Sequence, residues 1–267
     1  MSEGNDTDVT LAGIGVLITR PAHQGEHLAQ LIEQAGGVPI RFPTIEIAPP
    51  ADPDPLLAIL NRLAEYDLAI FISPNAVEQT FSWLRATRRE WPSNLPIAGV
   101  GRSTAAAIAK QGLSATTPAD RFDSEALLEL SLLQDVANKK VIIFRGAGGR
   151  ELLGDTLRLR GAEVAYAECY RRMQPRADAE TLIDAWRRGE IQIVSITSTD
   201  GLRNLHEMLG ETGRGWLYGT PVVVLSQAQA ATCRELGCEA AVLIATAASD
   251  EAILEAVQTW RRERFSL

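Results

Sequence analysis

The residues with the clearest chemical potential lie in short turns, each of which follows an apolar, β-branched segment. Ser73-Pro74-Asn75 and Ser198-Thr199-Asp200 also begin a helical pattern. A helix N-terminus exposes unpaired N–H groups and about half a positive charge, so it attracts anions. The same residue types also serve as simple helix caps. Each turn alone therefore fits either an anion site or a cap.

Four further turns follow predicted strands in the same way. They are Arg20-Pro21, Arg145-Gly146-Ala147, Gly101-Arg102-Ser103-Thr104 and the turn at Ser226. Ligands of open α/β sheets bind at the carboxyl ends of the strands. We therefore expect the six turns to line one rim in each of two domains. Two such rims facing each other would form a cleft rich in backbone donors, which suits carboxylates.

Tyr170 stands apart from these turns, on an extended segment between Cys169 and Arg171. Its hydroxyl could donate a proton to a ligand, with help from Arg171 or Arg172. Packing of the aromatic ring at an interface is the alternative. The Arg171-Arg172 pair is more typical of a solvated strand edge than of a ligand clamp.

The sequence lacks the residue patterns of several other kinds of functional site. The segment Gly99-Val100-Gly101 lacks the third glycine of a dinucleotide loop and the Gly-Lys-Thr of a Walker loop. His23 and His27 have no third metal ligand, and the three cysteines form no CxxC pair. HExxH and GxSxG motifs are absent as well. We therefore expect no metal and no cofactor.

Composition excludes further classes of function. The 267 residues are 46% hydrophobic, 22% charged and 6% aromatic, which is typical of a globular protein and long enough for two domains. The net charge of −8 disfavours a protein that coats nucleic acid or an anionic membrane. The acidic N-terminal sequence does not resemble an export signal, and no segment has the continuous apolarity of a membrane span. We expect a cytoplasmic protein with reduced thiols.

An internal repeat organises the chain. An offset of 125 residues places Arg20 on Arg145, Ser73 on Ser198 and Gly101 on Ser226 without a gap. Gly112 and Ser124 likewise fall on Gly237 and Ser249. The repeated units run from about residue 15 to 133 and from about 140 to 257, which indicates a duplication.

Within each repeat, short β-branched runs alternate with amphipathic helical patterns, which predicts parallel sheets covered by helices. Helices are expected, for example, at 25–35 and 178–188. Five strands are expected in each domain, at residues 16–19, 38–41, 68–72, 97–100, 114–116, 141–144, 163–166, 192–196, 222–225 and 241–244. Two extended segments that end in proline, 39–50 and 165–175, interrupt the rhythm, and we interpret them as crossings between the domains.

The order and spacing of these motifs resemble uroporphyrinogen-III synthases over nearly the whole chain, from Gly15 to about Val257. The resemblance rests on VLITRP, FISPNAV, GVGRSTA, AECYRR, SITSTDGL, LSQAQAATCRELG and TAASDEAIL. It implies two similar flavodoxin-like α/β domains with parallel five-stranded sheets, joined by a two-stranded antiparallel linker. Residues 1–42 and 174–267 would form one domain, residues 48–167 the other, and residues 43–47 and 168–173 the linker strands. The first strand–helix unit of each repeat would be exchanged between domains.

The resemblance also implies cofactor-free cyclisation of hydroxymethylbilane, with loss of water and inversion of ring D. The tyrosine that the family is proposed to use for departure of the hydroxyl group falls on Tyr170, and its substrate-contacting Ser and Thr turns fall on Ser73, Thr104 and Ser198. Substrate carboxylates would meet the turns at Arg20, Pro74, Asn75, Gly101, Arg102, Ser103, Arg145, Gly146, Ala147, Thr199, Asp200 and Ser226. Ala228 and Gln229 stand where some members carry a threonine, so a catalytic hydroxyl is not expected there.

Two other classes of protein share doubled α/β lobes. A two-lobe binding module without catalysis is the main alternative, but such receptors carry an export signal or a DNA-binding domain, which this sequence lacks. A nucleotide-sugar transferase would need a base-binding site that the sequence does not reveal. The expected partner is therefore the small polycarboxylate substrate, with no nucleic acid and no membrane. We further expect a monomer that makes transient contact with the hydroxymethylbilane-forming enzyme.

Overall fold

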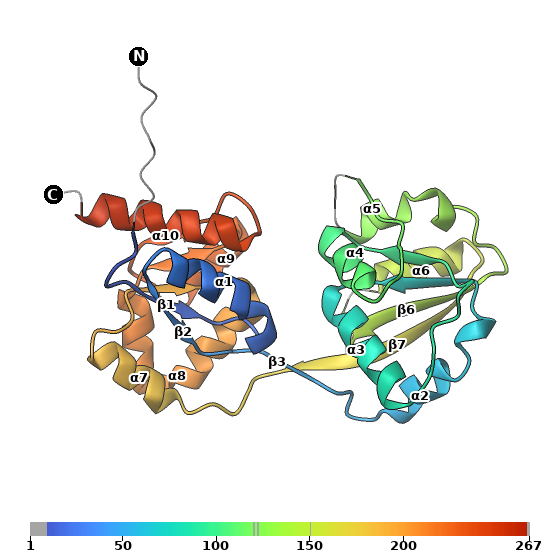
Figure 1. Cartoon of the computed structure of the whole chain (residues 1–267), viewed down its shortest axis with the longest axis horizontal. Coiled ribbons are helices and arrows are strands. Elements are labelled where there is room, and N and C mark those ends of the chain that lie inside the picture. Colours follow the sequence, from blue (N-terminus) through green and yellow to red (C-terminus); the bar gives the residue numbers. More distant parts are fainter. Residues whose placement is uncertain (1–9, 120, 122, 150, 266–267) are drawn as a thin grey trace, which may run out of the picture. The chain divides into compact units, whose positions relative to one another are not determined.

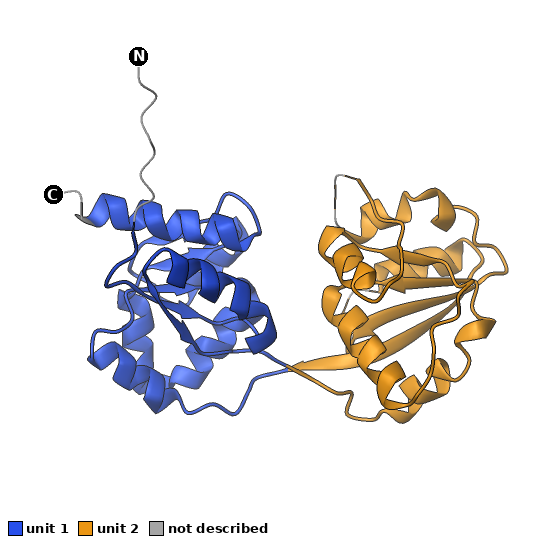
Figure 2. Ribbon diagram, in the orientation of Figure 1, with its two compact units in different colours: residues 1–46, 173–267 blue, residues 47–172 orange. Residues whose placement is uncertain are grey.

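The computed structural model describes residues 10–119, 121, 123–149 and 151–265. The chain divides into two compact units, which are coloured in Figure 2. Unit 1 combines Met1–Glu46 with Met173–Leu267, and unit 2 consists of Ile47–Arg172. Each unit contains one five-stranded β-sheet with its own helices (Figure 1).

The sheet of unit 1 has the strand order β10-β9-β8-β1-β2. Its neighbouring strands pair in parallel. Read from β2, this is the 2-1-3-4-5 order of flavodoxin-like folds. The strands are β1 (Gly15–Ile18), β2 (Val38–Arg41), β8 (Ile193–Ser195), β9 (Val222–Val224) and β10 (Val242–Ile244).

Helices cover both faces of this sheet because successive side chains of each strand point to opposite faces. Leu17 and Val194 enter one hydrophobic core, whereas Val16 and Ile193 enter the other. The first core includes residues of α7 and α8, and the second includes residues of α1 and α10. The helices of unit 1 are α1 (Ala22–Gln34), α7 (Ala179–Arg187), α8 (Thr199–Gly219), α9 (Gln227–Glu235) and α10 (Asp250–Phe265).

The sheet of unit 2 has the order β3-β7-β6-β4-β5. The central pairings of β6 with β4 and β7 are parallel, as is that of β4 with β5. The strands are β3 (Glu46–Ala48), β4 (Leu68–Phe71), β5 (Ile97–Gly99), β6 (Lys140–Gly146) and β7 (Glu163–Met173). The helices are α2 (Asp54–Leu60), α3 (Pro74–Ala86), α4 (Arg102–Ala109), α5 (Ser124–Leu128) and α6 (Leu152–Leu159), with 3-10 turns at Leu63–Glu65 and Ser131–Leu133.

Unit 2 also has a core on each face of its sheet. Phe71 and Phe144 stack at 4.6 Å between ring centroids in the core that α3 and α4 cover. Ile70 and Ile143, one residue earlier on the same strands, enter the core that α5 and α6 cover. Neighbouring residues of each strand therefore enter different cores, because their side chains point to alternate faces of the sheet.

The predicted α/β fold with parallel sheets is confirmed, but one predicted strand is wrong. Residues 114–116 form only an isolated parallel bridge, between Thr116 and Ala98. Pro118 follows two residues later and has no N–H for a longer ladder. The fifth strand of this sheet is instead β3, next to β7, within the segment that we interpreted as a crossing.

Residues separated by 125 positions have equivalent local structure in the two units. Ser73 and Ser198 both cap a helix through their side chains. Gly112 and Gly237 both have positive φ values, of 78° and 96°, just after a helix. Glycine adopts this left-handed conformation without steric cost, which explains its use at both helix ends.

The topology predicts that the N-terminal half cannot fold alone. A fragment of residues 1–133 lacks β6, the partner of β4, and β8, the partner of β1. We expect no cooperative thermal transition by circular dichroism, whereas the full chain melts cooperatively. A sharp two-state melt of the fragment would contradict the exchange of strands between the halves of the sequence.

Candidate active site

The predicted turns lie at the carboxyl ends of parallel strands within each unit. The Ser73 Oγ at the start of α3 accepts the Ala76 N–H at 3.1 Å, directly after β4. In unit 1, Ser198 and Ser226 accept the N–H groups of Gly201 and Gln229 at 3.0 and 3.3 Å, after β8 and β9. Gly101 starts α4 without a side-chain cap. Four helix N-termini therefore point their positive ends toward the carboxyl edges of the two sheets.

Tyr170 lies in β7, in the core of unit 2, with only 3% of its surface exposed. Its Oη is 3.1 Å from the Ser73 Oγ. Its carbonyl oxygen accepts the Ala147 N–H at 2.7 Å. A Cβ atom at position 146 would lie 2.8 Å from the tyrosine ring, so only glycine leaves room for this ring. Packing and hydrogen bonds thus fix the phenol against the start of α3.

A bulge in β7 directs Tyr170 toward α3. Arg145 pairs with Glu168, but the next residue, Gly146, pairs with Tyr170, so Cys169 has no partner in the ladder. Strand alternation alone would place Tyr170 on the same face as Glu168. Because one residue is skipped, Cys169 and Tyr170 both enter the core beneath α3, whereas Glu168 is exposed.

Arg145 is buried, with 6% of its surface exposed, and is engaged within unit 2. Its Nη2 lies 2.9 Å from Glu151 and 3.3 Å from Glu168, and its guanidinium stacks 4.1 Å above the Tyr166 ring. Burial lowers its pKa, but the hydrogen bonds and charges of the two glutamates outweigh this effect and raise it. The guanidinium therefore holds Glu151, Glu168 and the Tyr166 ring together within unit 2.

Arg20, the equivalent residue of unit 1, is also paired. Its Nη1 donates to Asp250 at the start of α10, and the same carboxylate lies 2.9 Å from the His27 Nδ1. Glu168 and Asp250 lie within motifs quoted above, but nothing in the sequence indicates that these carboxylates, or Glu151, pair with Arg145 and Arg20. Sequence reasoning therefore missed Asp250, Glu151 and Glu168.

The remaining predicted site residues differ in exposure. Thr104 is fully buried, and within the described part of the chain its hydroxyl has no hydrogen-bond partner. Asn75 is also buried. Pro74, Gly146, Thr199 and Ser226 are partly exposed, whereas Arg102, Ser103, Ala147 and Asp200 are exposed.

Gln229 has a structural role at its turn. Its side-chain oxygen accepts the Leu225 N–H at 2.8 Å, and its amide nitrogen donates to the Thr197 carbonyl at 3.2 Å. The side chain thus links the turns that follow β8 and β9. This contact accounts for an amide at a position where some members of the resembled family carry threonine.

Neither metal ligands nor exposed thiols indicate a functional site within the described residues. Within the residues described, no cluster of three or more His, Cys, Asp or Glu side chains is arranged to hold a metal ion. Cys169, Cys233 and Cys238 are buried free thiols. No helix in the same residues is both long and apolar enough to cross a membrane.

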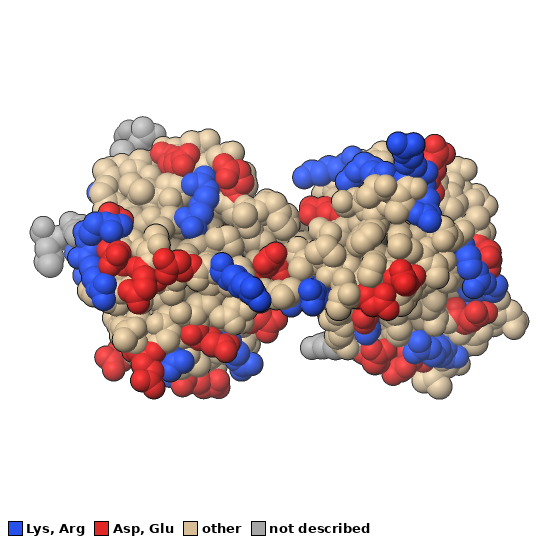
Figure 3. Space-filling view, turned by 90° about the horizontal axis from the view of Figure 1, so that it is seen from below, with Lys and Arg blue, Asp and Glu red and all other residues tan. Residues whose placement is uncertain are grey.

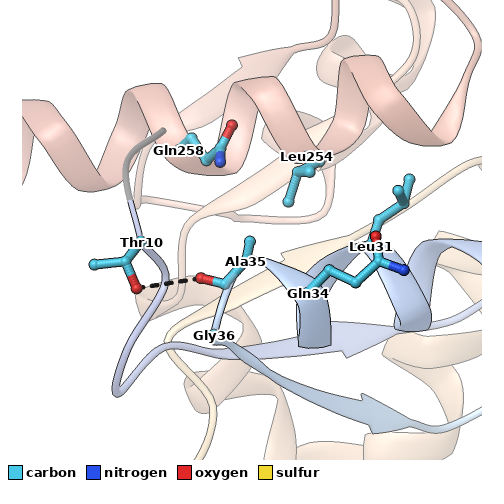
Figure 4. Close-up of a pocket in the computed structure, with 7 residues that line it drawn as sticks. All are labelled: Thr10, Leu31, Gln34, Ala35, Gly36, Leu254 and Gln258. Atoms are coloured by element: carbon cyan, nitrogen blue, oxygen red, sulfur yellow. Dashed lines mark hydrogen bonds between the residues drawn. The ribbon is translucent and has the colours of Figure 1, made fainter. Parts of the chain in front are cut away.

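Two of the cavities differ in whether a predicted site residue lines them. One of about 290 Å³ lies in unit 2, where Arg145 and Tyr166 line it together with Ile72, Val100, Asp123, Ser124, Ile143 and Leu153. Another of about 330 Å³ lies in unit 1 between α1 and α10, where Thr10 donates to the Ala35 carbonyl (Figure 4). Of the predicted site residues, Arg145 lines the first cavity, and none lines the second.

Surface charge is mixed on each unit. Figure 3 shows acidic side chains next to basic ones on the displayed face of both units. In unit 1, for example, Arg41 forms an ion pair with Glu26 at 3.3 Å and Arg187 with Asp184 at 2.8 Å. An anionic ligand would therefore depend on local donors rather than on a broad basic surface.

Parallel sheets whose carboxyl edges carry polar helix N-termini define an α/β protein of the kind that binds anionic ligands at these edges. A family model described as "Uroporphyrinogen-III synthase HemD" matches residues 26–255. The chain belongs to this uroporphyrinogen-III synthase family.

Individual relatives agree with this assignment. The chain is 37% identical to uroporphyrinogen-III synthase of Escherichia coli, over 92% of this chain and 100% of the relative. It is 31% identical to that of Synechococcus elongatus, over 95% and 97% of the two chains.

Solved structures show the same fold at low identity. A mutant uroporphyrinogen III synthase from Thermus thermophilus aligns with a TM-score of 0.60 and 19% identity, over 95% of this chain and 100% of that one. The protein titled uroporphyrinogen-III synthetase from Helicobacter pylori aligns with a TM-score of 0.58 and 16% identity, over 93% and 100%. The fold is thus shared by chains whose sequences have diverged widely.

The buried Cys169 thiol predicts a loss of stability at alkaline pH. Burial raises its pKa to about 12, compared with about 8.5 in an unfolded chain. The unfolded state therefore loses the thiol proton first, and stability falls as the pH rises from about 9 to 12, by up to about 1.4 kcal/mol per pH unit. Urea unfolding of wild type and Cys169→Ala at several pH values measures the difference. Parallel curves for the two proteins would contradict this assignment.

Proposed function

We propose that this protein converts hydroxymethylbilane into uroporphyrinogen III, as a lyase that removes water while it closes the ring and inverts ring D. The observation that carries the proposal is the family match over residues 26–255. The fixed position of Tyr170 beside Ser73 supports it, since departure of a hydroxyl group needs a proton donor. The enzyme thus belongs to tetrapyrrole (haem) biosynthesis.

The proposed reaction begins with cleavage of the terminal carbon–oxygen bond. The bonding electron pair leaves with the oxygen, which takes the Tyr170 hydroxyl proton and departs as water. The pyrrole nitrogen lone pair stabilises the remaining carbon as an azafulvene cation. The substituted carbon of ring D attacks this cation to form a spiro intermediate, which fragments and closes with ring D inverted. The proton released when the final pyrrole regains aromaticity restores the tyrosine, so the net loss is one water.

Binding of the polycarboxylate substrate is proposed to depend on the helix N-termini. Arg20 and Arg145 already neutralise carboxylates of the protein, so they supply little free positive charge. The N-termini of α3, α4, α8 and α9 offer backbone N–H groups and positive dipole ends at the sheet edges. We assign the substrate contacts to the exposed and partly exposed members of these turns, such as Arg102, Ser103 and Thr199.

Selectivity in the proposed reaction is a matter of positioning. Hydroxymethylbilane closes unaided to the symmetric type I isomer, so the enzyme must make the inverted route faster. A hundredfold preference needs roughly 3 kcal/mol of differential transition-state stabilisation. A few charge-assisted hydrogen bonds from fixed N–H groups supply energy of that order.

The proposal includes action in the cytoplasm by a monomer that meets the hydroxymethylbilane-forming enzyme transiently. The two compact units, each with its own two-sided core, support treating them as folding domains of one enzyme.

A direct assay tests this function. Purified protein with EDTA and no additive is expected to convert fresh hydroxymethylbilane mainly to the type III isomer, measured by chromatography after oxidation to porphyrins. Tyr170→Phe is expected to lower turnover about 100-fold, the lower range for a general acid, with the isomer ratio unchanged. Type I product at the level of a protein-free control would exclude this function. Wild-type turnover in Tyr170→Phe would remove the proton-donor role.

A further inference from the structure

The hydrogen bond between Ser73 and Tyr170 assigns Ser73 a role that differs from substrate binding. We propose that Ser73 is a positioning residue that donates its hydroxyl proton to the Tyr170 Oη and thereby directs the tyrosine O–H toward the substrate. This role rests on the proposed function, because it acts through the proton transfer of Tyr170.

The contacts of the Ser73 hydroxyl determine its direction. Its oxygen accepts the Ala76 N–H at 3.1 Å and lies 3.1 Å from the Tyr170 Oη. A serine hydroxyl has two acceptor lone pairs and one proton. The Ala76 N–H and the positive end of α3 draw electron density from this oxygen, which favours Ser73 as the donor in its bond with Tyr170.

This direction leaves the Tyr170 proton available for another acceptor. A tyrosine that donated to Ser73 would have no proton to offer to a substrate hydroxyl. The ring has little freedom to turn away, because it is buried and lies against Gly146. After the tyrosine proton moves to the departing hydroxyl group, the Ser73 O–H stabilises the phenolate that remains.

The repeat provides a natural comparison. Ser198, 125 residues after Ser73, caps α8 in the same way, with its Oγ 3.0 Å from the Gly201 nitrogen. The residue equivalent to Tyr170 by the same offset is Ile45, a buried side chain without a hydroxyl group. Both copies thus keep the serine cap, but only the Ser73 copy joins it to a phenol. The cap alone therefore does not explain the Ser73–Tyr170 pair.

Ser73→Gly removes the hydroxyl group with little loss of helix stability, because glycine at an N-cap costs only a few tenths of a kcal/mol. The variant therefore tests the role of the hydroxyl apart from its role as a helix cap. In the type III assay we expect Ser73→Gly to lower kcat about tenfold while KM changes less than about twofold, the pattern of an interaction made only in the transition state. Ser73→Thr, which keeps a hydroxyl, is expected to recover most of kcat. Ser249→Ala, which removes a cap that accepts the Ala252 N–H at 3.2 Å, is expected to keep wild-type kcat.

A double-mutant cycle tests whether Ser73 acts through Tyr170. In the Tyr170→Phe background, Ser73→Gly is expected to change kcat less than about twofold, because the group that it positions is gone. A full tenfold further loss, or a rise in KM with unchanged kcat, would overturn the positioning role and return Ser73 to substrate binding. Wild-type protein that forms only type I product would instead refute the proposed function itself.

Discussion

The skipped residue in β7 is the constraint on which the candidate site of unit 2 depends. Because Cys169 lies outside the ladder, Tyr170 faces α3 rather than the side of Glu168. The Cys169 thiol donates to the carbonyls of Arg145 and Ala76, which ties the bulge to β6 and to the first turn of α3. Bulges often redirect side chains next to active sites in this manner. The phenol, the serine cap and the glycine that makes room for the ring form one unit of structure.

The electrostatic potential at these turns depends more on backbone groups than on charged side chains. For the proposed polyanionic substrate, an acidic protein needs local positive potential, which helix N-termini can supply. Arg20 and Arg145 are buried or partly buried and paired, so they hold the turns in place. The fold itself is shared with the Thermus thermophilus structure at 19% identity.

The strands and several helix starts could be predicted from the sequence. Alternating β-branched runs predicted the parallel strands, and the serines at 73 and 198 marked helix starts, because both signals are local. The bulge could not be predicted, since it depends on the register between β6 and β7. The Ser73–Tyr170 bond joins residues 97 positions apart, and the partners of Arg20 and Arg145 likewise come from tertiary packing. The edge position of β3 was missed because neighbouring prolines indicated only an extended crossing.

Delivery of a proton from Tyr170 to the departing group can be tested by changing that group. A bilane with a protonated aminomethyl group in place of the hydroxymethyl group releases neutral ammonia and needs no proton from the enzyme. The measurement is the ratio of wild-type to Tyr170→Phe turnover on each substrate. We expect a ratio of about 100 with the hydroxymethyl substrate and a ratio within about threefold of unity with the aminomethyl substrate. An equal ratio on both would contradict proton delivery by Tyr170.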